Sequence, residues 1–162
     1  MKSAVHDSLA VVNASPLIFL SRGGHFDLLQ SIAATVLVPE IVVREISVRG
    51  RLDPTVKCLH RSTWLTIVND VSVPPSILSW GLGAGESAVL AYAMSQKCCQ
   101  ALIDDLAGRR CASALNIPVM GTLGIVLRAK RKGLLTAARP VLEDMLRTDK
   151  VPVPIHTMLH SA

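Results

Sequence analysis

The fold of this chain is decided first by residues 9–22, which read LAVVNASPLIFLSR. Leu9–Val12 is an aliphatic run typical of a strand that is buried on both faces. Ser15 and Pro16 then predict a helix start, with Ser15 as the N-cap and Pro16 at the first helical position. The predicted helix ends near Arg22, before two glycines. A buried strand that passes directly into a helix predicts an α/β unit.

Strands and helices alternate along the rest of the chain. Further strands are predicted at residues 35–38, 64–68, 100–103 and 117–120, and helices at 26–32, from 39 onward, and at 86–96, 106–115, 122–132 and 136–147. Residues 49–61 are polar and predict an irregular surface segment, and residues 73–75 predict a connector. This alternation predicts a three-layer α/β/α domain with a mostly parallel central sheet over residues 1–150, followed by a tail at 151–162.

Length and composition narrow the class of protein. A chain of 162 residues, half of them hydrophobic, suits one domain with an ordinary core. No apolar run reaches the roughly 18 residues that a membrane helix needs, and the start lacks a signal-peptide core, so we expect a cytoplasmic protein without membrane contact. The net charge of +5 permits an anionic partner such as nucleic acid. Aromatic residues make up only 3%, which argues against modules that bind RNA by stacking bases.

Two glutamates occupy unusual places on predicted helices. Glu45 is four residues after Ile41, on or beside the apolar face of its helix, where an unpaired acid costs several kcal/mol. The alternative is that Glu45 reaches solvent from the edge of that face. Glu86 opens a helix directly after Gly83–Gly85. It either belongs to a site that the glycines leave open or simply interacts with the helix dipole.

Three further polar residues follow predicted strands. Asn13 follows the first strand, and Asp104 and Asp105 end a later one. One Asp is enough to cap the next helix, so we expect the second to be free. Because ligands of parallel sheets collect at the carboxyl ends of the strands, these residues are expected to converge with Glu45 and Glu86. Such a cluster of oxygen ligands predicts a site for a hard divalent cation.

Four segments, in this order and spacing, resemble the PIN-domain family. They are Val11–Ile18, Val38–Ile46, Gly83–Ala91 and Leu102–Asp105, and the branch with a Gly-Thr-Leu-Gly element, here within Gly121–Gly133, is the most similar. The resemblance covers residues 9 to 150 and implies a PIN-like fold. It also implies a metal-dependent ribonuclease, typically a VapC-like toxin of a toxin–antitoxin pair, whose acids bind Mg²⁺ or Mn²⁺. RNA, an antitoxin protein and a homodimer partner are implied with it.

Position by position, the resemblance assigns the site residues. The metal ligands fall on Asn13, Glu45, Glu86 and Asp105, with Asp104 as an auxiliary acid, and the four acids are the catalytic set. Asn13 replaces the usual Asp; its amide oxygen can bind a hard cation but adds no charge. Ser15 matches a small hydroxyl residue beside the first acid. Residues expected to contact nucleic acid are Ser15, Arg109, Arg110, Arg128, Lys130, Arg131 and Lys132, of which the last four also suit the negative end of a helix dipole.

Two other readings remain open. Asn13 favours a catalytically weak PIN-like module that binds nucleic acid or a protein. A nucleotide-binding doubly wound domain is the third reading, although no glycine-rich phosphate loop follows the first strand. Self-association is expected in addition, because residues 26–32 and 41–48 carry apolar side chains that a small core need not cover.

Overall fold

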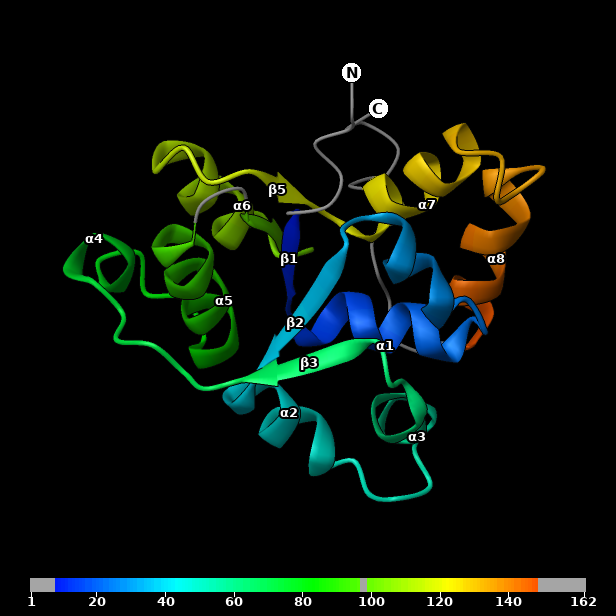
Figure 1. Cartoon of the computed structure of the whole chain (residues 1–162), viewed down its shortest axis with the longest axis horizontal. Helices are drawn as coiled ribbons and strands as arrows, with labels where there is room; N and C mark the ends of the chain where they lie inside the picture. The colour runs from blue at the N-terminus through cyan, green and yellow to red at the C-terminus, as the bar shows by residue number, and fades with distance from the viewer. Residues whose placement is uncertain (1–7, 97–98, 149–162) are drawn as a thin grey trace.

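A computed structural model describes residues 8–96 and 99–148 of the chain (Figure 1). The predicted tail at 151–162 lies outside the described residues. The strands are β1 (Leu9–Val12), β2 (Thr35–Pro39), β3 (Leu65–Val68), β4 (Cys99–Leu102) and β5 (Val119–Met120). They form one sheet in the order β3-β2-β1-β4-β5, in which every described pair is parallel. The predicted α/β class with a mostly parallel sheet is confirmed.

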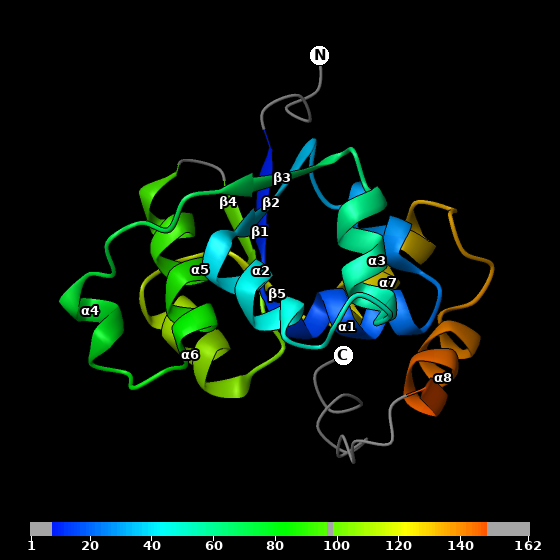
Figure 2. The same cartoon turned by 90° about the horizontal axis from the view of Figure 1, so that it is seen from below.

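Helices cover both faces of the sheet (Figures 1 and 2). One layer contains α1 (Ala14–Arg22), the 3-10 helix η1 (Phe26–Ser31), α3 (Pro54–Arg61), α7 (Thr122–Arg131) and α8 (Ala138–Thr148). The other layer contains α4 (Pro75–Leu78), α5 (Ala84–Ser95) and α6 (Leu106–Ala114). The helix α2 (Glu40–Ser47) lies between the layers and packs against α1, α3 and α5.

The core lies on the two central strands. Ala10, Val11 and Val12 of β1 and Ala101 and Leu102 of β4 are fully buried. Burial of each larger aliphatic side chain stabilises the fold by about 1.5–3 kcal/mol. Val36, Leu37 and Val38 of β2 are buried as well. The strands that carry the polar residues Asn13 and Asp104–Asp105 at their ends therefore belong to the buried centre of the sheet.

The start of α1 differs from the prediction. The helix begins at Ala14, Asn13 is its N-cap and Pro16 is its third residue, so Ser15 is not the cap. The reason is that Asn13 still belongs to the sheet: its backbone is extended and its N–H donates to the carbonyl of Leu102 at 3.0 Å. The strand therefore passes into the helix without an intervening loop.

The irregular segment predicted at residues 49–61 is wrong, because residues 54–61 form α3. Asp53 caps this helix by accepting a hydrogen bond from the N–H of Thr55 at 2.8 Å, and Pro54 stands in its first turn. Thr55 is buried and shares a 2.7 Å hydrogen bond with the hydroxyl of Ser21 in α1. Burial of that polar pair against α1 is a tertiary effect, although the Asp-Pro start is a local helix signal.

The apolar residues that led us to expect self-association are mostly inside this chain's own core. Phe26, Leu29 and Ile32 are buried, as are Val42 and Ile46, whereas Val48 at the end of α2 is 86% exposed. Homodimer formation therefore stays a prediction, but exposed apolar residues on these helices no longer support it. None of the helices in the described ranges is long and apolar enough to cross a membrane.

Candidate functional site

The sheet has a topological switch point at β1. This strand pairs with β2 on one side and with β4 on the other. The chain continues from β2 to β3 at one edge of the sheet and from β4 to β5 at the other edge, so the strand order runs in opposite directions on the two sides of β1. Such a point opens a crevice at the carboxyl ends of the strands, where ligands bind. Asn13 follows β1 there, and Asp104 and Asp105 follow β4. Figure 2 shows α2, α5 and α6 gathered around the same region.

Asn13 lies at the centre of the site. It is only 3% exposed, and its side chain does not cap α1 although the residue holds the N-cap position. Instead its amide Nδ2 donates to Oε1 of Glu86 at 3.1 Å. Its Oδ1 is buried and has no hydrogen-bond partner among the described residues. A buried carbonyl oxygen without a partner costs about 1–3 kcal/mol, so this acceptor is one that a ligand would satisfy.

Glu45 lies on the other side of Asn13, beside Gly85. A Cβ atom placed on Gly85 would be 2.6 Å from Oε2 of Glu45 and 2.9 Å from Oδ1 of Asn13. Both oxygens therefore face one point that only glycine leaves open. The backbone N–H of Gly85 donates to the Glu45 carboxylate. Loss of hydration, and then the charge of Glu86, raise the pKa of Glu45, and the Gly85 hydrogen bond opposes them.

Asp105 extends the cluster beyond Glu86. It caps α6, and its Oδ2 accepts a hydrogen bond from the N–H of Gly108 at 2.8 Å. A Cβ on Gly108 would lie 3.6 Å from that Oδ2 and 3.7 Å from Cγ of Glu86. The structure thus brings together Glu45, Asn13, Glu86 and Asp105 from four separate elements.

Asp104 is used differently from its neighbour. Its Oδ1 accepts a hydrogen bond from the N–H of Thr122, and its Oδ2 accepts one from the Thr122 hydroxyl, both at 2.6 Å. Burial raises the pKa of Asp104, while these two hydrogen bonds and the charge of Arg109 oppose the shift. The expectation that one of the two Asp residues is free is wrong, because Asp105 caps α6 and Asp104 ties the end of β4 to the start of α7.

The cluster carries negative charge without a protein counterion. In the part of the chain that the structure describes, Glu45, Glu86 and Asp105 form no ion pair with Lys, Arg or His. Within the same residues, no three His, Cys, Asp or Glu side chains converge tightly enough to hold a metal ion by themselves. The amide of Asn13 stands between the carboxylates instead. Carboxylate and amide oxygens are ligands that fit Mg²⁺ or Mn²⁺.

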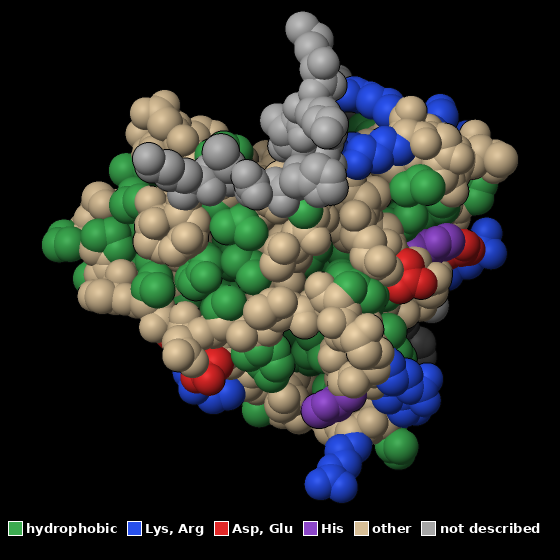
Figure 3. All heavy atoms as spheres, in the orientation of Figure 1, with side chains coloured by type: hydrophobic (Ala, Val, Ile, Leu, Met, Phe, Trp, Pro, Cys, Tyr) green, Lys and Arg blue, Asp and Glu red, His purple; other side chains and the backbone are tan. Residues whose placement is uncertain are grey.

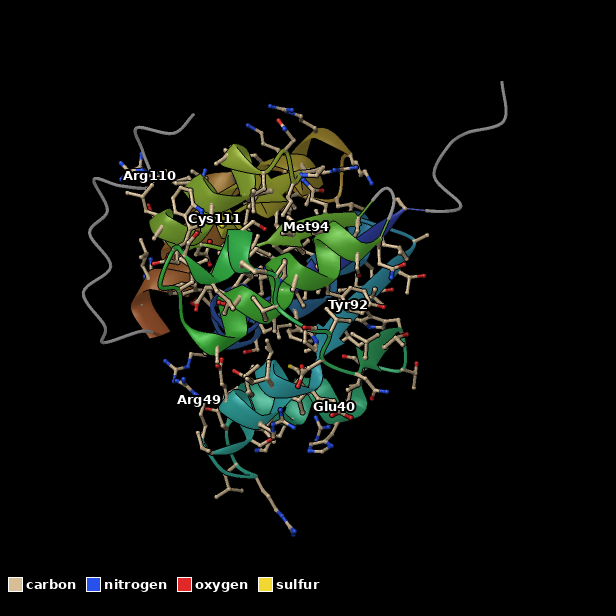
Figure 4. The ribbon with its side chains drawn as sticks, turned by 90° about the vertical axis from the view of Figure 1, so that its left-hand side faces the viewer. Glu40, Arg49, Tyr92, Met94, Arg110 and Cys111 are labelled. Atoms are coloured by element: carbon tan, nitrogen blue, oxygen red, sulfur yellow. The ribbon has the colours of Figure 1, made fainter. Side chains whose placement is uncertain are left out.

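The predicted nucleic-acid residues fall into two groups. Ser15 is in the first turn of α1, and Arg109 is one turn after Asp105 on α6, so both lie near the acids. Arg110 is exposed at the outer edge of α6 (Figure 4). Basic residues gather toward the far end of α7 (Figure 3), about 9–15 Å from Thr122 along the helix at 1.5 Å per residue. These are Arg128, Lys130, Arg131 and Lys132, and the Lys132 ammonium donates to the carbonyl of Ser31.

Two residues that build the site were not predicted from the sequence. Thr122 fixes Asp104, and Asp70 fixes α2, the helix that carries Glu45. Oδ1 of Asp70 accepts a hydrogen bond from the N–H of Ile41 at 3.1 Å, and its Oδ2 pairs with Arg44 at 2.9 Å. Asp70 thereby supplies the cap that Pro39, at the N-cap position, lacks. No local signal identifies it, because 29 residues separate Asp70 from Ile41.

Comparison with models of protein families gives a match that covers most of the chain. The model of a protein family described as a PIN domain matches residues 9–153. A search of curated proteins gives no match. The matched range contains all five strands and every side chain of the acidic cluster.

Proposed function

This chain belongs to the PIN-domain family, whose fold is of the nuclease type, and we propose that it is a ribonuclease that depends on Mg²⁺ or Mn²⁺. The observation that carries the proposal is Oδ1 of Asn13, a buried acceptor without a partner among the described residues. It lies beside the Glu45 carboxylate at Gly85. An acceptor and an acid that face the same point are suited to a cation, which satisfies both.

Four residues of the cluster would hold the ion: Asn13, Glu45, Glu86 and Asp105. Each is already oriented by a hydrogen bond from the protein. Asn13 donates to Glu86, while the N–H groups of Gly85 and Gly108 donate to Glu45 and Asp105. When bound, the divalent ion lowers the pKa of a water molecule and stabilises charge that develops on a phosphodiester. The side chains therefore supply ligands and orientation, and none has to act as the nucleophile.

RNA as the substrate rests on the family and on charge. The chain has a net charge of +5 although its cluster is acidic, so basic residues elsewhere can attract a polyanion. A catalytically weak module that binds RNA or a protein is the second candidate. It is favoured by Asn13, which brings one negative charge fewer than an Asp would.

The deciding experiment is cleavage of single-stranded RNA by the intact chain after removal of metal and readdition of Mg²⁺ or Mn²⁺. Cleavage should depend on the ion and should be lost in Asp105→Ala and Glu45→Gln. Glu40→Gln is the matched control, because Glu40 is an exposed acid on the same helix as Glu45. If the wild type binds RNA but cuts none with either ion, the nuclease proposal fails and the binding module replaces it.

A role as the toxin of a toxin–antitoxin pair is the narrower part of the proposal, and it rests on the family resemblance. Expression in bacterial cells should arrest growth, and the arrest should require Asp105. Coexpression of a short reading frame adjacent to the gene should relieve it. Normal growth at a high level of folded wild-type protein would contradict the toxin role without touching the nuclease proposal.

A further inference from the structure

We propose that Arg109 binds a phosphate of the RNA beside the acidic cluster, and that Asp104 positions the Arg109 side chain rather than serving as a metal ligand. This inference rests on the proposed ribonuclease function. It assigns different roles to the two adjacent aspartates: Asp105 would bind the metal ion, and Asp104 would orient the arginine that binds the substrate.

Asp104 is committed to protein contacts. Both of its oxygens accept short hydrogen bonds from Thr122, each 2.6 Å long. A carboxylate that is held on both oxygens at the start of α7 has little freedom to turn toward Glu86. Asp105, in contrast, accepts its hydrogen bond from Gly108 on Oδ2, and Glu86 adjoins the same glycine. The geometry therefore favours Asp105 as the ligand.

Arg109 extends from the helix that Asp105 caps. Its backbone N–H donates to the carbonyl of Asp105 at 2.9 Å, so the two residues are one turn apart on α6. Its Nη1 lies 3.7 Å from the point where a Cβ on Gly121 would be, and Oδ1 of Asp104 lies 3.0 Å from that point. The guanidinium and the Asp104 carboxylate thus lie on the same side of Gly121, at the edge of the cluster, without a direct ion pair between them.

The N–H donors of the Arg109 guanidinium are not used by other side chains among the described residues. Arg109 is partly exposed, and within residues 8–96 and 99–148 its side chain forms no hydrogen bond and no ion pair within 4.0 Å. The negative charge of Asp104 attracts it without occupying its N–H groups. The planar fork of an arginine matches two oxygens of a phosphate, which a lysine does not.

An RNA phosphate needs a cation at this place. The substrate brings further negative charge to a site whose three carboxylates form no ion pair among the residues that the structure describes. The basic residues at the end of α7 are a helix length away, and Arg110 points outward from α6 (Figure 4). Arg109 lies where it can offset part of that charge without competing for the carboxylates that would hold the ion.

The test compares Arg109→Gln, Arg109→Lys and Asp104→Asn with Arg139→Gln. The control removes an arginine that is 89% exposed on α8, at the opposite end of the molecule from α6. Binding of a fluorescein-labelled single-stranded RNA is followed by anisotropy over a range of salt concentrations, and Mn²⁺ binding is followed separately by calorimetry. Thermal melts verify that each variant is folded.

Arg109→Gln should weaken RNA binding about tenfold, reduce the slope of log affinity against log salt by about one, and leave Mn²⁺ affinity unchanged. Arg109→Lys should recover the slope but only part of the affinity. Asp104→Asn should resemble Arg109→Gln and keep the Mn²⁺ affinity. If Arg109→Gln binds RNA like Arg139→Gln, or if Asp104→Asn loses Mn²⁺, the inference is overturned. A wild type that binds Mn²⁺ but no RNA would instead reject the proposed function itself.

Discussion

Replacement of Asn13 by aspartate should make the metal-free protein less stable and the metal-bound protein more stable. In the metal-free site, Asn13→Asp removes the Nδ2 donor that lies 3.1 Å from the Glu86 carboxylate. A hydrogen bond to a charged group contributes about 1.5–3 kcal/mol. The new carboxylate also faces Glu86, and two like charges 4 Å apart repel by about 1 kcal/mol even at the permittivity of water.

Together these effects lower the free energy of unfolding by about 2.5–4 kcal/mol. For a protein of this length, that corresponds to a fall in Tm of about 5–15 °C. The introduced carboxyl at position 13, crowded by like charge, responds by holding a proton, so its pKa in the folded state rises. A raised folded pKa favours the folded state at low pH, and the deficit should therefore shrink as the pH is lowered.

With a divalent ion bound, the Asn13→Asp variant should become more stable than the wild type. Aspartate adds a hard anionic ligand, and each tenfold gain in affinity adds about 1.4 kcal/mol to the stability at saturating ion. The assay is thermal unfolding near neutral pH, after chelation and then with millimolar Mn²⁺. Gln30→Glu is the control, because it makes the same amide-to-carboxylate change at an exposed residue of η1.

Two results would refute this reasoning. A metal-free Asn13→Asp protein as stable as the wild type would mean that the hydrogen bond to Glu86 contributes nothing. An equal rise in Tm with Mn²⁺ for variant and wild type would mean that residue 13 does not bind the ion.

The other predictions concern Gly85, Glu45 and Cys99. Gly85→Ala puts a Cβ 2.6 Å from Oε2 of Glu45 and 2.9 Å from Oδ1 of the buried Asn13, so both side chains must shift and the free energy of unfolding should fall, although the better helix propensity of Ala offsets up to about 1 kcal/mol of that loss. Binding of Mn²⁺ to this variant, measured by calorimetry, should also be lost. Retained Mn²⁺ binding would contradict the proposal that Asn13 and Glu45 bind the ion at the point beside Gly85. The raised pKa of Glu45 favours its protonated form in the folded state, so metal-free stability from this group is present below pH 4.5 and lost as the pH rises through the raised pKa. When the free energy of unfolding is measured in urea over a pH series, Glu45→Gln should remove this loss of stability. An unchanged pH dependence in Glu45→Gln would contradict the raised pKa of Glu45. Burial raises the pKa of Cys99 from 9.0 to about 11, so the stability that its neutral thiol provides is complete below pH 9 and lost as the pH rises through about 11. Cys99→Ala should remove this alkaline loss, and rapid reaction of the native Cys99 thiol with a disulfide reagent near pH 8 would disagree with its burial.

Local patterns in the sequence were sufficient for the class of fold. Aliphatic runs such as Leu9–Val12 define buried strands, and Gly and Pro mark where the elements end, because both signals act within a few residues. The same reasoning placed Asn13 and Asp105 at strand ends, and the structure brings them to one edge of the sheet. It failed at residues 54–61, where the Asp-Pro start was visible but the burial of Thr55 against Ser21 of α1 was not.

What the sequence determined by itself is therefore the parallel α/β architecture and the edge at which the acidic side chains collect. Only the tertiary structure decided which hydrogen-bond partner each side chain has at that edge. Asp104 and Asp105 are identical and adjacent, yet one binds Thr122, 18 residues away, and the other caps its own helix. Asn13 has the position of a cap but turns to Glu86, 73 residues away. Hydrophobic periodicity is a short-range property of the chain, whereas the hydrogen-bond partner of a polar side chain depends on which distant element the fold brings beside it.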